Sequence, residues 1–343
     1  MTANATKRSI RNIMRRSNPQ EKLNILTFPT HERYEENLCK TGHNFYSLTV
    51  LPGKEWDQDY AKAPDNYTIF HKIPDNVEFD LILAHSSCNR LQIAHDYLSS
   101  TQGATGNMCH IPILRHCHVL PDVRFDVNSQ IQAYGSIPIG ENSFISKYNM
   151  NAWGYSEDNS SVVEHGVDVD FWRPDDNISK DNVCLSVVND WPNRDWCCGY
   201  NLWRQTVQGL PIKVFGKSPG LSEPASSTEH LREIYQSSTI FYNTSLHSPV
   251  PTVLLEAMAC GCAIVSTANC MIPEIIENGK NGLISNDPQE LRGFLELLLK
   301  DKDLAKELGD NARKTIVEKY NLETFVDNWN KLFYSTVNNY RNK

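Results

Sequence analysis

The chain has 343 residues, 40 % of them hydrophobic, and a formal net charge of −8 with an isoelectric point near 5.8. This length and composition predict about two globular domains, each with its own core, and exclude an intrinsically disordered protein. The acidic balance gives no reason to expect tight nucleic-acid binding. Basic residues gather only in the arm formed by residues 1–20, which is expected to be a solvated tail rather than a segment that docks on an anionic surface.

The sequence also indicates the cellular compartment of the protein. No apolar run approaches the roughly 18 residues needed to cross a bilayer, and the amino terminus lacks the apolar stretch of a secretory signal. The ten cysteines show no paired spacing that would close a zinc site. We therefore expect a cytoplasmic protein with reduced thiols and no transmembrane segment.

Short apolar runs in the first half of the chain predict strands, as in a buried parallel sheet. They occupy residues 23–28, 45–51, 79–84 and 111–114, and a polar helical stretch ending at Gly42 separates the first two. His85 ends the third run, and His116 and His118 follow the fourth. Polar residues at strand ends are where open α/β sheets place their ligands.

A second series of apolar runs lies at residues 183–188, 212–216, 239–242 and 263–266. The two series predict an α/β chain of two Rossmann-like, doubly wound domains with a cleft between them. The expected boundaries are 21–172 for the first domain, 173–182 for a polar linker and 183–320 for the second domain. Helix-start signals stand at Asp287 and Asn321, and the apolar face of the last helix, 321–343, is expected to cross back over both domains.

The most informative stretch is 248–262, in which Glu256 interrupts an otherwise apolar helix that ends near Gly261. A lone buried carboxylate is costly unless a hydrogen-bonding partner accompanies it. The unpaired N–H groups at the start of this helix also form a natural anion site. Two interpretations stay open: a ligand with hydroxyl and phosphate groups, such as a sugar nucleotide, or a core helix whose glutamate meets a buried arginine.

Three segments together resemble a known family. They are 162–174, which contains Val167, Asp168 and Phe171; 248–261 around Glu256; and 263–283. This combination is similar to the retaining glycosyltransferases of family four, which have the GT-B fold and use nucleotide-sugar donors. The similarity is strong over residues 160–335 and is more a matter of pattern over 20–160.

The resemblance implies the donor-binding residues. It implies that Glu256 binds the ribose of the donor. The first glutamate of the family motif is replaced by Ser248 in this chain, and a glycine of the family is replaced by Pro251, which has no N–H to offer. The phosphate would then meet the Thr252 hydroxyl and the N–H groups of Thr252 and Val253. Gly216 and Lys217 are placed at the donor as well.

The resemblance also implies catalytic and acceptor-side residues. Arg194 is the candidate for stabilising the leaving phosphate, with Arg204 and Lys217 behind it; the alternative is a surface arginine paired with a neighbouring aspartate. His85 is favoured over His116 and His118 as the histidine near the sugar, the alternative being a structural histidine. Position alone assigns the acceptor side to residues after the first strand and to one histidine: Thr30, His31, Arg33 and His116.

The function implied is that of an enzyme, a hexosyl or pentosyl transferase that moves a sugar from a nucleoside diphosphate sugar to an acceptor hydroxyl with retention. The resemblance implies no cofactor and no metal, because basic side chains and a helix start stabilise the leaving diphosphate. A glycan or lipid-linked saccharide is the expected acceptor, ahead of a modified nucleobase in DNA. The rival functions are a nucleotide-sugar epimerase or hydrolase and a non-catalytic nucleotide-sugar binding module.

Overall fold

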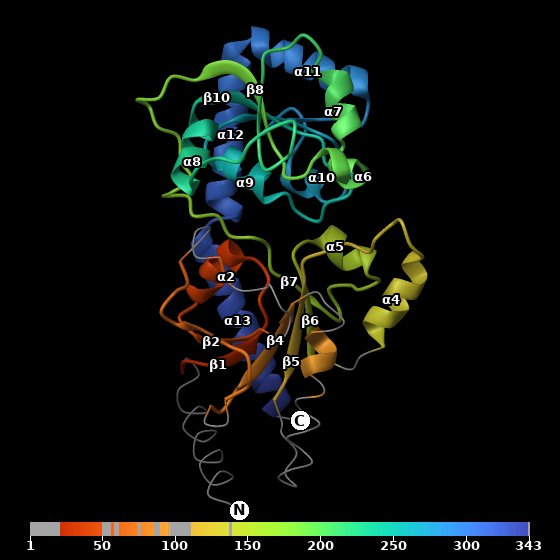
Figure 1. Cartoon of the computed structure of the whole chain (residues 1–343), viewed down its shortest axis with the longest axis vertical. Helices are drawn as coiled ribbons and strands as arrows, with labels where there is room; N and C mark the ends of the chain where they lie inside the picture. Colours follow the sequence, from red (N-terminus) through yellow and green to blue (C-terminus); the bar gives the residue numbers. More distant parts are fainter. Residues whose placement is uncertain are drawn as a thin grey trace, which may run out of the picture. The chain divides into compact units, whose positions relative to one another are not determined.

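The computed structural model describes residues 21–49, 56, 57, 62–74, 77–85, 90–94, 96, 111–136 and 139–341 (Figure 1). The basic arm, Cys88 and Cys109 lie outside the described residues. The chain divides into two compact units. Unit 1 comprises Met1–Cys117, Gln132–Ser143 and Val326–Lys343, and unit 2 comprises His118–Ile131 and Phe144–Phe325.

The first sheet has seven strands in the order β3-β2-β1-β4-β5-β6-β7. Its strands are β1 (Asn24–Thr27), β2 (Asn44–Leu48), β3 (Tyr67–Phe70), β4 (Leu81–His85), β5 (Ile113–Cys117), β6 (Glu141–Phe144) and β7 (Ser161–Val162). The pairs from β3 to β5 are parallel. Every residue of β4 and β5 is buried, which explains the apolar run in β4 and at the start of β5. The remaining elements before β8 are α2 (Glu32–Cys39), α4 (Val127–Gly135) and α5 (Lys147–Ala152).

Strand β5 runs further than the apolar run predicts, so His116 lies inside it and pairs in register with His85 of β4. The reason is Arg115, a buried residue that apolar patterning cannot assign to a strand. Its guanidinium donates to Asn142 Oδ1 at 2.9 and 2.7 Å and lies 3.3 Å from the centre of the Tyr134 ring. With these partners a charged side chain is accommodated in the interior.

The second sheet has five parallel strands in the order β12-β11-β10-β8-β9. They are β8 (Asp181–Val187), β9 (Ile212–Phe215), β10 (Ser238–Asn243), β11 (Ala263–Ser266) and β12 (Leu283–Ile284). The four strands expected from this part of the sequence are therefore confirmed. Parallel strands need crossover connections, and helices supply them here.

The helices of the second half are the 3-10 turn Pro192–Arg194, α6 (Asp195–Cys198), α7 (Tyr200–Thr206), α8 (Thr228–Gln236), α9 (Thr252–Ala259), α10 (Ile272–Ile275), α11 (Pro288–Lys300), α12 (Lys302–Lys319) and α13 (Leu322–Arg341). One core of unit 2 joins the sheet to α8 and α9, and the other joins it to α7 and α11 (Figure 1). Helices thus cover both faces of the second sheet, as in a doubly wound domain.

Both predicted helix starts are confirmed. The Asp287 carboxylate accepts from the N–H groups of Gln289 and Glu290, at 2.6 and 3.2 Å, and Asn321 Oδ1 accepts from the N–H of Thr324 at 2.8 Å. In unit 1, the buried face of α13 carries Trp329 and Phe333, which pack on His116 and Phe45 of the sheet. Among the described residues, no helix is long and apolar enough to span a membrane.

Candidate functional site

In unit 2, the loops after β8 and β9 are locked together at the carboxyl ends of the strands. The N–H of Lys217 donates to Asn189 Oδ1 at 2.8 Å, and the N–H of Asp190 donates to the Lys217 carbonyl at 2.8 Å. Gly216 has φ of +116°, and a Cβ there would lie 2.2 Å from the Val188 carbonyl oxygen, so only glycine fits. This packing leaves the Lys217 side chain exposed beside the strand ends.

Arg194 lies just after β8, at the end of the 3-10 turn, and its side chain is exposed. Its guanidinium donates to the Asn189 carbonyl at 3.4 Å. The neighbouring aspartates are engaged elsewhere: Asp190 accepts from Asn193 at 2.7 Å, and Asp195 accepts from Asn201 at 2.7 Å. Within the described part of the chain Arg194 has no carboxylate partner, so its charge is available to an anion. Arg204 lies on α7, with its guanidinium 5.7 Å from the Tyr200 ring centre.

Helix α9 begins after Pro251 without a side-chain cap. Proline has no N–H, and the N–H groups of Thr252 and Val253 precede the first hydrogen bond of the helix, which Leu254 makes to the Pro251 carbonyl at 3.0 Å. Thr252 is exposed and Ser248, in the loop before it, is half-buried. An uncapped helix start of this kind offers hydrogen-bond donors and a partial positive charge to an anion.

Glu256 is buried in the second turn of α9, with only 6 % of its surface exposed, and Leu254, Leu255, Ala257 and Met258 around it belong to the core. Its Oε2 accepts a hydrogen bond from the hydroxyl of Tyr235, a fully buried residue, at 3.2 Å. The nearby Arg313 donates instead to the carbonyls of Trp172 and Ala259, at 3.1 and 2.6 Å. The helix therefore retains a carboxylate where packing alone favours an apolar side chain.

In unit 1, the carboxyl end of β4 brings His85 next to a second buried carboxylate. His85 is fully buried, and its Nε2 lies 3.8 Å from Oε1 of Glu35, which is 1 % exposed on α2. Burial raises the Glu35 pKa to about 8, and the charge of Arg90 opposes this shift. The backbone N–H of Thr30 also lowers this pKa, although its distance and angle to the carboxylate are outside those of a hydrogen bond.

His116 is held by the protein itself. Its Nε2 lies 3.1 Å from the Tyr34 hydroxyl, and its Nδ1 lies 2.7 Å from Ser143 Oγ. Its ring also packs edge-on against Trp329, with the centroids 4.7 Å apart. With both nitrogens and the ring engaged, His116 connects β5 to α2, β6 and α13 in the interior of unit 1.

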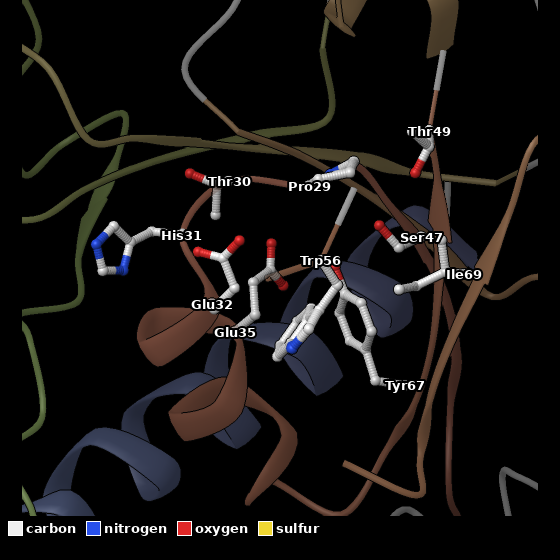
Figure 2. Close-up of a pocket in the computed structure, with 10 residues that line it drawn as sticks. All are labelled: Pro29, Thr30, His31, Glu32, Glu35, Ser47, Thr49, Trp56, Tyr67 and Ile69. Carbon is white, nitrogen blue, oxygen red and sulfur yellow. The ribbon is translucent and has the colours of Figure 1, made fainter. Parts of the chain in front are cut away.

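A cavity of about 250 Å³ opens beside Glu35. It is lined by residues of the loop after β1, α2, β2 and β3, and by Trp56: Pro29, Thr30, His31, Glu32, Glu35, Ser47, Thr49, Trp56, Tyr67 and Ile69. In Figure 2 the carboxylates of Glu32 and Glu35 point toward the same space as the hydroxyls of Ser47 and Thr49. The structure thus brings Thr30 and His31 to one cavity near His85, whereas Arg33 and His116 do not line it.

Sequence reasoning missed Glu35 and the cavity beside it. The available signal was the spacing in α2, where the buried residues Tyr34, Glu35, Leu38 and Cys39 recur at helical intervals. That spacing places a carboxylate on the buried face, as in α9. The helix is otherwise so polar that its buried face did not stand out. Across the described residues, no three His, Cys, Asp or Glu side chains gather as metal ligands would.

Residues 224–315 match the family described as Glycosyl transferases group 1. The alpha-maltose-1-phosphate synthase of Mycolicibacterium smegmatis is 34 % identical over 101 residues, which cover 27 % of this chain and 26 % of that protein. The probable sucrose-phosphate synthase of Thermosipho melanesiensis is 34 % identical over 116 residues, covering 33 % and 27 % respectively. The chain thus spans about a quarter of the length of these curated relatives.

Solved structures resemble nearly the whole chain. Anabaena HepE in complex with UDP superposes with a TM-score of 0.71 at 13 % identity, covering 92 % of this chain and 100 % of that one. The sucrose-phosphate synthase from Thermosynechococcus elongatus gives a TM-score of 0.68 at 14 % identity, covering 92 % and 99 %. At these identities the likeness establishes the fold. The chain has the GT-B fold of glycosyltransferases, and its residues 224–315 are similar to the Glycosyl transferases group 1 family.

Proposed function

We propose that the protein is a glycosyltransferase that moves a hexosyl or pentosyl group from a nucleoside diphosphate sugar to an acceptor hydroxyl. The group 1 match covers α8 and α9, which carry Tyr235 and Glu256. HepE was solved with UDP, which makes uridine diphosphate sugars the first donors to test.

The observation that carries the proposal is the buried Glu256 one turn inside an uncapped helix start. A carboxylate accepts two hydrogen bonds from vicinal hydroxyls well, and a ribose presents such a pair. The N–H groups of Thr252 and Val253 supply donors for a phosphate at the helix start. One helix therefore offers partners for both the ribose and the diphosphate of a sugar nucleotide.

The chemistry proposed for the transfer uses charges of unit 2. The bond between the anomeric carbon and the diphosphate oxygen breaks, a bond from that carbon to the acceptor oxygen forms, and the acceptor proton passes to the departing diphosphate. Arg194 and Lys217, exposed at the ends of β8 and β9, stabilise the leaving charge with the start of α9. We propose that this needs no metal, so transfer persists in EDTA. We further propose attack from the face of departure, which retains the anomeric configuration.

The donor proposal is tested by thermal unfolding with uridine, guanosine, cytidine and adenosine diphosphate sugars. A ligand bound only by the folded state raises the melting temperature by mass action. The Glu256→Gln variant is expected to weaken donor binding about 10-fold to 100-fold, since a hydrogen bond to a charged group is worth about 1.5 to 3 kcal/mol. Glu233→Gln, an exposed change on α8, is the matched control.

If no donor raises the melting temperature, the donor-site proposal is wrong. If a donor binds, proton NMR of the reaction shows which activity follows. Transfer with the anomer unchanged supports the proposal, and an inverted anomer contradicts retention. Altered or free sugar released without an acceptor indicates an epimerase or hydrolase. Donor binding with no turnover under any acceptor indicates a binding module.

A further inference from the structure

Buried polar atoms without hydrogen-bond partners cluster around the cavity of unit 1. They are both carboxylate oxygens of Glu35, Ser47 Oγ, Thr49 Oγ1 and the Tyr67 hydroxyl. The Ser47 side chain opposes the burial-driven rise of the Tyr67 pKa, so these two groups are close, but none of the five atoms has a partner in hydrogen-bond geometry among the described residues. The exposed fractions of the four residues are 1, 0, 7 and 6 %. All four line the same cavity.

Such a cluster is costly in a folded protein. Most buried polar side-chain atoms have a partner, and each one left without a partner costs about 1 to 3 kcal/mol. Other buried polar atoms without a partner in hydrogen-bond geometry are scattered through the described residues, for example the hydroxyls of Thr27 on β1 and Thr336 on α13, but five of these atoms line this one cavity. A group of such atoms around one hollow marks a place where water, or a bound molecule that displaces it, supplies their partners.

The lining defines the chemistry of that molecule. Among the described residues that line the cavity there is no lysine or arginine, whereas the acidic side chains of Glu32 and Glu35 do line it, so a phosphate or carboxylate meets two acids and neither of these cations. The hydroxyls of Ser47, Thr49 and Tyr67 both donate and accept, which matches the hydroxyl groups of a ligand.

Two aromatic rings add apolar surface to this polar lining. The rings of Trp56 and Tyr67 lie 4.7 Å apart at 56°, and both residues line the cavity. Rings of this kind pack against the apolar face of a saturated ring while hydroxyls around its rim find polar partners. At about 250 Å³ the cavity is smaller than the range of about 300 to 1,000 Å³ typical of drug-sized ligands, which favours a single ring.

We propose that the cavity of unit 1 binds one neutral, hydroxyl-rich ring, a sugar or a cyclitol, and rejects rings that bear a phosphate or a carboxylate. Identifying this ring with the acceptor of the transfer rests on the proposed function; its binding does not. The Glu35 carboxyl and the Ser47 and Thr49 hydroxyls hold the rim of the ring, and Trp56 and Tyr67 cover its face.

The test is binding of defined rings to the full chain without any donor, measured by calorimetry and saturation-transfer NMR. The neutral probes are glucose, mannose and myo-inositol, and the charged probes are glucose 6-phosphate, mannose 6-phosphate and glucuronate. At least one neutral ring is expected to bind, with a Kd at least about 10-fold below that of its charged counterpart. Binding of none of the neutral rings, or equal binding of the charged ones, overturns the proposal.

A matched pair of variants locates the site. Thr49→Val and Thr27→Val each replace a buried hydroxyl without a partner by a methyl group of the same shape, but only Thr49 lines the cavity. Thr49→Val is expected to weaken the ring's affinity about threefold to tenfold, the effect of one hydrogen bond, while Thr27→Val leaves it unchanged. Equal effects of the two variants would place the ring elsewhere. Circular dichroism confirms that both fold.

The outcomes separate this proposal from that of the enzyme's function. If rings bind in the cavity but no sugar nucleotide binds unit 2, the proposed transferase is wrong and the ring site stands. If a donor binds and transfer occurs but only charged rings accept the sugar, the ring site is wrong and the transferase stands.

Discussion

Replacing Glu35 by glutamine isolates the cost of its buried charge. Glutamine has the shape of a protonated glutamate, so the Glu35→Gln variant removes the titration of this side chain and little else. The group is 1 % exposed, and its pKa rises from 4.5 to about 8 because burial disfavours the charged form. Arg90 and the Thr30 N–H lower this pKa and Glu32 raises it, but burial has the largest effect.

The direction and size of the effect follow from linkage. A carboxylate with a raised pKa in the folded state contributes full stability below its unfolded pKa near 4.5, and this stability is lost as the pH rises toward 8. At 1.36 kcal/mol per pKa unit, the loss is about 1 kcal/mol at pH 5, about 3 at pH 7 and about 4 at pH 8. The Glu35→Gln variant does not incur this loss, so its free energy of unfolding should exceed that of the unmodified protein by an amount that grows with pH.

Urea unfolding of both proteins at pH 5 and pH 8 measures this advantage, and hydrogen exchange of the buried β4 amides assigns it to unit 1. Glu36→Gln, the adjacent and half-buried position of α2, is the control. The expected gain of Glu35→Gln is about 3 kcal/mol larger at pH 8 than at pH 5. An equal gain at both pH values would show that the Glu35 pKa is not raised in the folded protein, against our reasoning.

Two further substitutions test unit 2. Arg194→Ala should lower the transfer rate about 100-fold or more, because it removes positive charge at the leaving phosphate. The melting temperature should stay unchanged, because the residue is exposed. Lys314→Ala on α12 is the control, and an equal loss of rate in both variants would contradict a specific role for Arg194. Gly216→Ala should destabilise the fold by more than about 1 kcal/mol, because its Cβ would meet the Val188 carbonyl. Gly293→Ala lies in open space on α11 and should stabilise the fold by up to about 1 kcal/mol. Similar unfolding midpoints for the two variants would refute the argument.

The sequence predicts those parts of the fold in which the apolar pattern and the burial coincide. In unit 2, four short apolar runs become β8 to β11. The inner strands β10 and β11 are almost wholly buried, because parallel strands covered on both faces leave little place for polar residues, whereas β9 lies at the edge of the sheet and is partly exposed. The same rule fails at β5. There Arg115 is buried by a partner that lies far along the chain, Asn142, and pairing at that distance leaves no mark in a local pattern.

The candidate site was predictable to a similar extent. Glu256 is evident because every other residue of α9 after Thr252 is apolar, so the one acid is conspicuous. Glu35 has the same burial, but it follows Glu32 and precedes Glu36 in a polar helix. Only the fold reveals which of these acids faces the interior. The cavity beside it depends on β2 and β3, whose side chains meet α2 through tertiary packing alone.

Glu35 and Glu256 occupy equivalent local positions. Glu35 lies at the end of the first turn of α2 and Glu256 at the start of the second turn of α9, each helix follows the carboxyl end of a parallel strand, β1 or β10 respectively, and both residues are buried. A carboxylate near a helix start normally gains from the positive end of the helix dipole. At Glu35 the raised pKa shows that burial outweighs this gain, so the position costs stability in the free protein. A residue that lowers stability without packing benefit is the kind that function retains, and replacing it should stabilise the protein while weakening its ligand.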